Sequence, residues 1–395
     1  MPRLPEKERL HPAADIPVVW GLTDREKSVL SLLRRTGPLT RSSLIRESGL
    51  SGPAIFRVTE ELAGAGLLMI GEAVAEGRGQ PSNRVALQGD AAFSIGLSVM
   101  SDYAEAVLMD LGGAVRAVAQ VTAPGMTQAG IYANLTGFMD DLVARGMLPH
   151  KRLVGIGIAV AGYFIGEGDQ VNPSPELEDW ALVDLAAPAA ARFGLSVQVE
   201  NIASAAAVGE ALLGVGRRIH DFVYVNVASG FGGGLILDGR LRRGRFGNAG
   251  ELGGILSNAG LPIPTLESLR QHLISHGVPL AGITELVEGF DPDWPGLDGW
   301  VEQAAASLHV LAKIAGHILD VQAVVLGGRL PPALSGRLAE KAAFDHAALD
   351  AAARRGRAMP LPQILPAEVS SRAAAVGAAT LPLASTFFSL LPVAG

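Results

Sequence analysis

Residues 226–254 constrain the fold more than any other stretch of this chain, because ten of these 29 residues are glycine. Glycine at this density indicates a backbone that turns tightly or lies directly against a neighbour or a ligand. Residues 222–227 predict a buried strand, and strand character returns at 235–237 before an Asp238-Gly239 turn. We therefore expect a β-hairpin with a glycine-rich bend at 230–234. Such a bend can offer N–H groups to a phosphate, although a structural turn is the commoner explanation.

The composition sets the class of protein. The chain has 395 residues, 49% hydrophobic and 18% charged, which is enough apolar material for two or three domains. It has no cysteine, so disulfides, thiolate chemistry and cysteine-ligated zinc are excluded, as suits a cytoplasmic protein. The first 15 residues carry charges and prolines where a secretory signal has an apolar core, so we do not expect secretion.

The carboxyl-terminal stretch 373–395 is uncharged over 23 residues, a length that could span a bilayer. Pro382, Pro392 and the Ser385-Thr386 pair interrupt it. These residues argue against a membrane span, so we expect no membrane partner.

Charge divides unevenly along the chain. Residues 1–88 hold 12 Lys and Arg against 10 Asp and Glu, whereas residues 89–395 hold 20 against 29. The first part is therefore +2 and the second −9. An acidic body does not bind nucleic acid by itself, so any contact with DNA must come from the first 88 residues.

A helix-turn-helix pattern lies in that first part. Apolar residues recur at helical spacing over 22–35, and Thr40 can cap a short helix at 41–48. Gly49 supplies a turn before a third helix that runs from 50 to 65. Residues 67–87 alternate and turn through 76–81, which predicts a β-hairpin wing. The second helix of such a pair enters the major groove of DNA.

On the third helix we expect one face in the core and another on DNA. Ile55, Val58 and Leu62 share the core face. An arginine can bind a guanine edge and an aromatic ring can lie on a thymine methyl, while a wing arginine can enter a narrow minor groove. A solvated surface charge is the alternative for a single arginine on this helix. The candidate DNA-binding residues are Ser51, Gly52, Pro53, Phe56, Arg57 and, in the wing, Arg78.

Several of these stretches resemble the ROK family, which contains sugar kinases and sugar-responsive transcriptional repressors. The helices and wing resemble the winged helix-turn-helix of ROK repressors. The run from Asp238 to Gly253, with Gly250-Glu251-Leu252-Gly253 at its end, resembles the family signature. The hairpin expected at 93–121 resembles the actin-like lobe of sugar kinases. The resemblance also implies a small-residue packing helix in the carboxyl-terminal stretch 373–395. The resemblance implies an α/β fold: a winged helix-turn-helix domain at 1–88 and a two-lobed, actin-like (ribonuclease H-like) ATPase-type ROK domain at 89–395.

Two residues that the kinases need are replaced. The kinases carry Asp-x-Gly-Gly-Thr in the first hairpin, whereas Ser98 stands in place of the aspartate here. Their catalytic base is the aspartate of Glu-Asn-Asp-Ala-Asn, and the corresponding residue is Ile202. Losing a positioned base costs roughly 10²- to 10⁴-fold in rate, and phosphoryl transfer also depends on neutralised charge. We expect no kinase activity and no cofactor. Gly327-Gly328 resembles the adenosine-side motif, but such a turn also occurs for reasons of fold.

The sugar side of the family site is partly retained. The resemblance implies sugar contacts from Asn172, Asn201, Glu251 and Glu267, whose amides and carboxylates can each pair with two vicinal hydroxyls. Gly254 replaces a family histidine, and residues 257–269 have no metal ligand where relatives hold zinc, so we expect no metal. Asn172 could instead be an ordinary turn residue, and Glu267 a carboxylate that caps a helix at 266–276.

Together these features predict a DNA-binding transcriptional regulator, a repressor by expectation, whose degenerate kinase-like domain senses a sugar or sugar derivative. Its expected partners are double-stranded operator DNA, a sugar effector, and further copies of itself in a homodimer or homotetramer. Closure of the lobes would change the spacing of paired winged domains. The alternatives are a sugar kinase with a DNA-binding head, and a regulator that binds DNA independently of any ligand.

Overall fold

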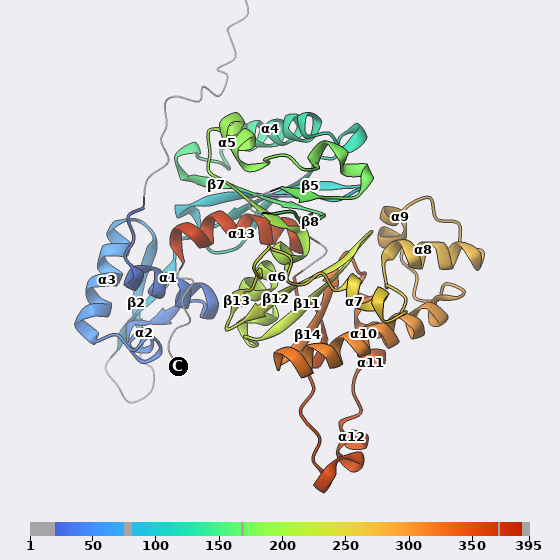
Figure 1. Ribbon diagram of the computed structural model, residues 1–395. Coiled ribbons are helices and arrows are strands. Elements are labelled where there is room, and N and C mark those ends of the chain that lie inside the picture. The colour runs from blue at the N-terminus through green and yellow to red at the C-terminus, as the bar shows by residue number, and fades with distance from the viewer. Residues whose placement is uncertain (1–19, 75–80, 167–169, 370–371, 389–395) are drawn as a thin grey trace, which may run out of the picture.

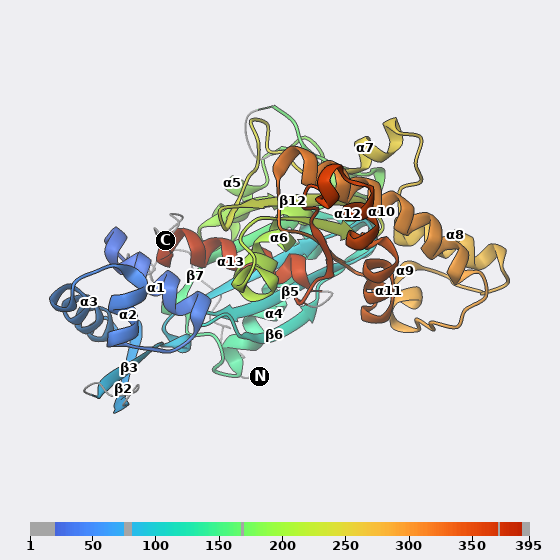
Figure 2. The same cartoon turned by 90° about the horizontal axis from the view of Figure 1, so that it is seen from below.

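A computed structural model describes residues 20–74, 81–166, 170–369 and 372–388. It confirms the predicted fold class: helices of a winged helix-turn-helix type precede a two-lobed α/β body (Figure 1). The N-terminal domain, here called the head, lies at one end of the molecule. Figure 2 shows the same arrangement from below, with the head and helix α8 (Leu266–Ser275) at opposite ends.

The head forms as its capping residues predict. Thr23 and Glu26 make a reciprocal capping box at the start of α1, and the Thr40 hydroxyl accepts from the Ser43 N–H at the start of α2. Gly49 ends α2 in the left-handed region, with φ of 68°. Its helices are α1 (Asp24–Thr36), α2 (Arg41–Ser48) and α3 (Gly52–Gly64). Its sheet has the order β1 (Leu39–Thr40), β3 (Ser82–Leu87), β2 (Leu68–Val74).

The two lobes of the body repeat one sheet topology. In each, three antiparallel strands are followed by two strands parallel to the first of them. The first sheet has the order β10 (Val197–Asn201), β7 (Leu153–Val160), β4 (Phe93–Val99), β5 (Ala104–Asp110), β6 (Val115–Gln120). The second has the order β13 (Arg240–Leu241), β12 (Phe231–Leu237), β11 (Phe222–Val227), β14 (Ala323–Gly328), β15 (Gln363–Pro366). This duplication is the defining feature of actin-like folds.

Helices cover both faces of each sheet. Helices α4 (Gln128–Ala144) and α5 (Ala186–Phe193) lie on the outer face of the first sheet. The second sheet is covered by α8, α10 (Leu297–Leu319) and α11 (Pro332–Ala342). The remaining elements are the short hairpin β8 (Tyr163–Phe164) and β9 (Val171–Asn172), helices α6 (Ile202–Leu213), α7 (Gly253–Asn258), α9 (Ile283–Glu288), α12 (His346–Ala352) and α13 (Ala373–Phe387), and 3₁₀ turns at Gly89–Ala91, Pro124–Met126, His150–Arg152, Pro175–Trp180, Val215–Arg217 and Arg354–Gly356.

The glycine-rich stretch is a hairpin, but the expected glycine bend is wrong. Gly232, Gly233 and Gly234 lie inside β12, paired with β11, and the chain turns earlier, where the Ala228 N–H donates to the Gly230 carbonyl. A Cβ on Gly234 would lie 2.5 Å from that of Ala207 on α6. These glycines therefore serve close packing of a helix on the strand, and their peptide groups belong to the sheet.

Helix α13 packs closely against β4, β7 and α6, and a glycine at each of these three contacts lets the two backbones approach. A Cβ on Gly96 of β4 would lie 2.0 Å from the Ala375 carbonyl, and one on Gly157 of β7 would lie 1.9 Å from that of Ala378. Within α13, a Cβ on Gly377 would lie 1.7 Å from the Ala205 carbonyl of α6. The expected small-residue packing helix is thus confirmed, wedged between the first sheet and α6. Among the described residues, no helix is both long and apolar enough to cross a membrane.

The head and the body share one apolar core. The cluster that contains Leu30 of α1 and Ile55 of α3 continues into Met109 of β5 and Phe387 of α13. The rings of Trp20 and Phe387 lie 5.6 Å apart, and Lys27 donates to the Ser385 carbonyl at 3.3 Å. The two domains are therefore joined by packing as well as by the chain that connects them.

Candidate DNA-binding and ligand-binding sites

Helix α3 presents the face that the sequence predicts. Ile55, Val58 and Leu62 are buried in the head, as expected. Ser51 stands at the N-cap position but makes no capping bond, so within the described residues its hydroxyl is available to another partner. The predicted DNA-binding residues at this helix are exposed, except for Gly52, which is half-buried. The exposed ones are Ser51, Pro53, Phe56 and Arg57.

Arg41, which the sequence did not single out, supports the predicted DNA-binding side of α3. The Arg41 guanidinium lies 4.6 Å from the centre of the Phe56 ring, and its Nε donates to the Thr59 hydroxyl at 2.9 Å. Arg41 also pairs with Glu60. Phe56 is 56% exposed, so the stack with Arg41 helps to hold an aromatic ring on the surface. Helical spacing within α3 gives no signal for Arg41, because it comes from α2.

Arg57 is held only loosely. Its Nε lies 3.9 Å from the Glu61 carboxylate, and both side chains are more than half exposed. Exposed pairs at this spacing contribute about 0.3–0.5 kcal/mol, so Arg57 can exchange Glu61 for another anion at little cost.

In the wing, Arg78 lies outside the described residues and stays a prediction. Arg84 of β3 is exposed and has no polar partner among the residues that the structure describes. The alternation of β3 could have identified it, because its neighbour Val85 points into the core and Arg84 must then point out.

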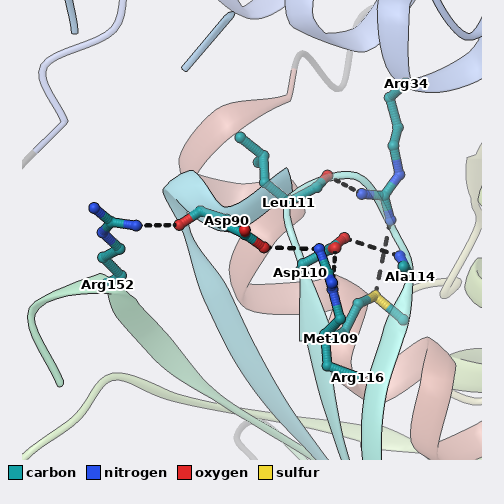
Figure 3. Close-up of polar contacts among 8 residues, drawn as sticks. All are labelled: Arg34, Asp90, Met109, Asp110, Leu111, Ala114, Arg116 and Arg152. Carbon is teal, nitrogen blue, oxygen red and sulfur yellow. Dashed lines mark hydrogen bonds and ion pairs between the residues drawn. The ribbon is translucent and has the colours of Figure 1, made fainter. Parts of the chain in front are cut away.

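A polar cluster lies where the head meets the body (Figure 3). Arg34 of α1 reaches into the body and donates to the Leu111 carbonyl, and its other terminal nitrogen lies 3.8 Å from the Met109 sulfur. Burial of the guanidinium lowers the pKa of Arg34 to about 10, against an opposing effect of Asp110. The side chain therefore stays charged at neutral pH, inside the junction.

Asp110 anchors the turn that carries this contact. Its carboxylate accepts from the Ala114 N–H at 2.9 Å and from Arg116 Nε at 2.6 Å. Arg116 also bonds Asp90 at 2.7 Å, and Arg152 donates to the Asp90 carbonyl at 2.8 Å (Figure 3). Asp110 is 2% exposed, so these bonds fix the β5–β6 turn against α1.

Two of the predicted sugar-binding residues meet at the edge of the first lobe. Asn201 is the N-cap of α6: its oxygen accepts from the N–H groups of Ala203 and Ser204, and its nitrogen donates to the Gly162 carbonyl at 2.6 Å. Asn172, on β9 beside Gly162, donates to the Tyr163 hydroxyl at 2.7 Å. Asn201 thus retains one N–H for a ligand, since its oxygen is used by the helix.

Glu251 comes to the same region on a loop of the second lobe. Asn248 on this loop makes two hydrogen bonds of 2.8 Å with the backbone of Phe164, and the Glu251 N–H donates to the Asn248 carbonyl. The buried carboxylate of Glu200 also holds the loop, because Arg243 Nε donates to it at 2.7 Å. Glu251 is exposed as a residue, yet partial burial of its carboxyl group raises its pKa.

Glu267 has a partner of its own. It lies in the first turn of α8, where Arg270 donates to both carboxylate oxygens at 2.7 and 2.9 Å and lowers the pKa of Glu267. The capping oxygen of α8 comes instead from Thr265, which accepts from the Ser268 N–H at 3.0 Å. The role of Glu267 in sugar binding stays a prediction. Leu266 is buried beside the partly buried Leu261 and Ile263, so apolar packing occupies the stretch for which the family resemblance implied zinc.

The residues at the expected kinase positions face a cavity between the lobes. Ile202 packs with Met100, Ala205 and Ala228, so its surroundings are apolar. The cavity has a volume of about 250 Å³. Its walls include Ser98, Met100, Tyr103, Glu105, Ile202, Asn226, Ala228, Thr284, Val287, Glu288, Gly328, Arg329 and Arg372. In the described part of the chain, no three His, Cys, Asp or Glu side chains gather as a metal site would require.

The fold and these sites define a class of protein, a winged-helix head on a duplicated actin-like body. In sequence, residues 94–267 match the family described as "ROK family". The similarity to this family therefore covers residues 94–267 of the 395. The solved structure of a ROK family transcriptional regulator, a homolog of the Escherichia coli MLC protein, aligns with a TM-score of 0.65 at 21% identity, over 92% of this chain and 96% of its own.

The curated relatives include repressors. The chain is 27% identical to the protein y4fQ of Sinorhizobium fredii over 95% of this chain and 94% of that protein. It is also 27% identical to the xylose repressor of Bacillus spizizenii, but over 58% of this chain and 59% of the repressor. Glucokinases also resemble part of the chain. The chain therefore resembles both repressors and glucokinases over part of its length.

Proposed function

We propose that this chain is a DNA-binding transcriptional regulator, a repressor, whose ROK domain binds a sugar or sugar derivative without phosphorylating it. The observation that carries the proposal is the exposed face of α3 on a head whose core continues into the body. The repressor relatives support it. The units proposed are a DNA-binding domain at 1–88 and a sensor at 89–395.

In this proposal, ligand binding in the body is transmitted to the head through α6 and through α13, on which α6 packs. Asn201 caps α6, and the other end of α6 carries Leu213, which lies against Gly113 beside Arg34 of the head. A ligand that bonds to Asn201 and displaces it would therefore move α6, whose other end lies where the head meets the body. It can shift the head only as far as it binds one arrangement better than the other.

DNA binding is tested with Arg57→Ala. Operator fragments are first selected from random DNA with the full chain, and affinities are measured by fluorescence anisotropy at several salt concentrations. A base contact is worth about 1–3 kcal/mol, so we expect a loss of roughly 5- to 150-fold and weaker selectivity at one base pair. Arg145→Ala is the control, because Arg145, the C-cap residue of α4, is also an exposed arginine paired with an acidic residue four positions away, Asp141. Equal behaviour of the two variants would contradict a role for Arg57.

Ligand binding is tested by thermal unfolding against monosaccharides, amino sugars and sugar phosphates, with and without ATP and magnesium. A site ligand at about a hundred times its Kd adds roughly 2.7 kcal/mol to the unfolding free energy. We expect one sugar to raise the midpoint in the wild type and less in Glu251→Gln, with Glu178→Gln on the surface as control. The absence of any shift would favour a regulator that needs no ligand.

The kinase alternative predicts a different outcome. An ADP-release assay with the same sugars should show no turnover, because Ile202 offers no group that accepts a proton. Clear ADP release that Glu251→Gln abolishes would overturn the proposal of a non-catalytic sensor.

A further inference from the structure

The cavity between the lobes holds two polar side chains without a partner. Ser98 of β4 is 3% exposed and Asn226 of β11 is 6% exposed, and both line the cavity. Neither side chain makes a hydrogen bond to any residue in the described ranges. Both residues line the cavity, so their polar atoms are available to a molecule bound there. Two such groups on facing lobes indicate a molecule that pairs with both.

The charges around the cavity argue against an anionic occupant. Arg329 is paired with Asp102 at 3.1 Å and with the Thr284 hydroxyl at 3.0 Å. Arg372 is paired with Glu105 at 3.1 Å. Glu105 is 5% exposed, so a phosphate in the cavity would lie beside a buried carboxylate. The two arginines are thus neutralised in place, and no excess of positive charge is left for a nucleotide.

The size and the apolar walls narrow the class of ligand further. About 250 Å³ is below the ~300–1,000 Å³ typical of sites for drug-sized ligands. Met100, Ile202 and Val287 add apolar surface beside the polar groups. A molecule that fits must be small and uncharged, with hydroxyls on one side and C–H groups on the other.

We propose that this cavity binds a small uncharged polyol, such as a sugar alcohol or a cyclitol, at a site separate from Asn172, Asn201 and Glu251. Its hydroxyls pair with Ser98 of the first lobe and Asn226 of the second. A ligand bound to both side chains holds the lobes together, so it stabilises one lobe arrangement independently of the sugar site.

The test uses xylitol and myo-inositol as probes, with inorganic phosphate and AMP as charged comparators. Binding to the full chain is measured by saturation-transfer NMR and by calorimetry. We expect the polyols to bind the wild type and to bind Asn226→Leu at least tenfold more weakly, which corresponds to about 1.4 kcal/mol. Glu302→Gln, on the exposed face of α10, should bind as the wild type does.

Ser98→Ala is a second variant, since it removes one hydroxyl from the cavity and keeps the test valid if Asn226→Leu does not fold. It should weaken binding in the same direction. The proposal is overturned if neither polyol binds at millimolar concentration, or if both variants bind as well as the wild type. It is equally overturned if phosphate or AMP binds through Ser98 and Asn226 in preference to the polyols.

Discussion

Alanine in place of Gly377 should destabilise the protein by about 2 kcal/mol, although glycine-to-alanine changes inside helices normally stabilise. The normal gain is about 0.8–1.0 kcal/mol. Against it, the new Cβ would lie 1.7 Å from the Ala205 carbonyl oxygen and 2.4 Å from its carbon. Both partners are helix backbone and cannot rotate away, so α6 and α13 must separate. Overpacking costs about 1–3 kcal/mol, and we take the upper end because no flexible side chain absorbs it.

Gly336 provides the matched control. It is the fifth residue of α11, as Gly377 is the fifth of α13, and a Cβ at Gly336 meets no atom within 4 Å. Gly336→Ala should therefore stabilise by about 1 kcal/mol. The unfolding free energies of the two variants are thus expected to differ by about 3 kcal/mol. For a domain of 150–250 residues this corresponds to roughly 6–12 °C in Tm.

Scanning calorimetry and urea unfolding followed by circular dichroism measure both variants beside the wild type. A Gly377→Ala protein that is as stable as Gly336→Ala would refute the close contact of α6 and α13. If Gly377→Ala is less stable, its DNA affinity tests the coupling: the response to a bound sugar should weaken more than in Gly336→Ala, because α6 no longer lies against α13.

Two further predictions concern the head. Thr23→Ala removes the capping box of α1 and should lower the unfolding free energy by about 1 kcal/mol in urea titrations, whereas Thr23→Ser should behave as the wild type. The pKa of Arg34 is lowered to about 10, so the unfolded chain holds this proton more tightly than the folded one. Above pH 10, the unfolding free energy of the wild type should rise relative to that of Arg34→Met by about 1.4 kcal/mol per pH unit. A difference in unfolding free energy that does not change with pH would contradict the burial of a charged Arg34.

The head was predictable because its signals are local. Thr23, Thr40 and Gly49 each act on the helix beside them, and the spacing of Ile55, Val58 and Leu62 is a property of one helix. The duplicated sheets were predictable through the family resemblance. Such features need only a few neighbouring residues to be read correctly.

The errors and omissions came from contacts between distant residues. The glycines of β12 were expected to bend because nothing nearby in the sequence shows that α6 lies on them. Arg41 supports Phe56 from another helix, and Arg329 pairs with Asp102 across 227 positions. Asn201 was predicted as a sugar ligand, and it also caps α6, a use that depends on where the helix begins.

The shared core of head and body has a consequence for biosynthesis. Helix α1 leaves the ribosome early, but α13, which completes its core, is made about 340 residues later, roughly 20–70 s at ~5–20 residues per second. For that interval the head has only its own core and the first strands of the body to pack against, and the side of α1 that meets Phe387 lacks this partner. A chain whose translation stops early therefore exposes the apolar surface that α13 covers in the complete protein.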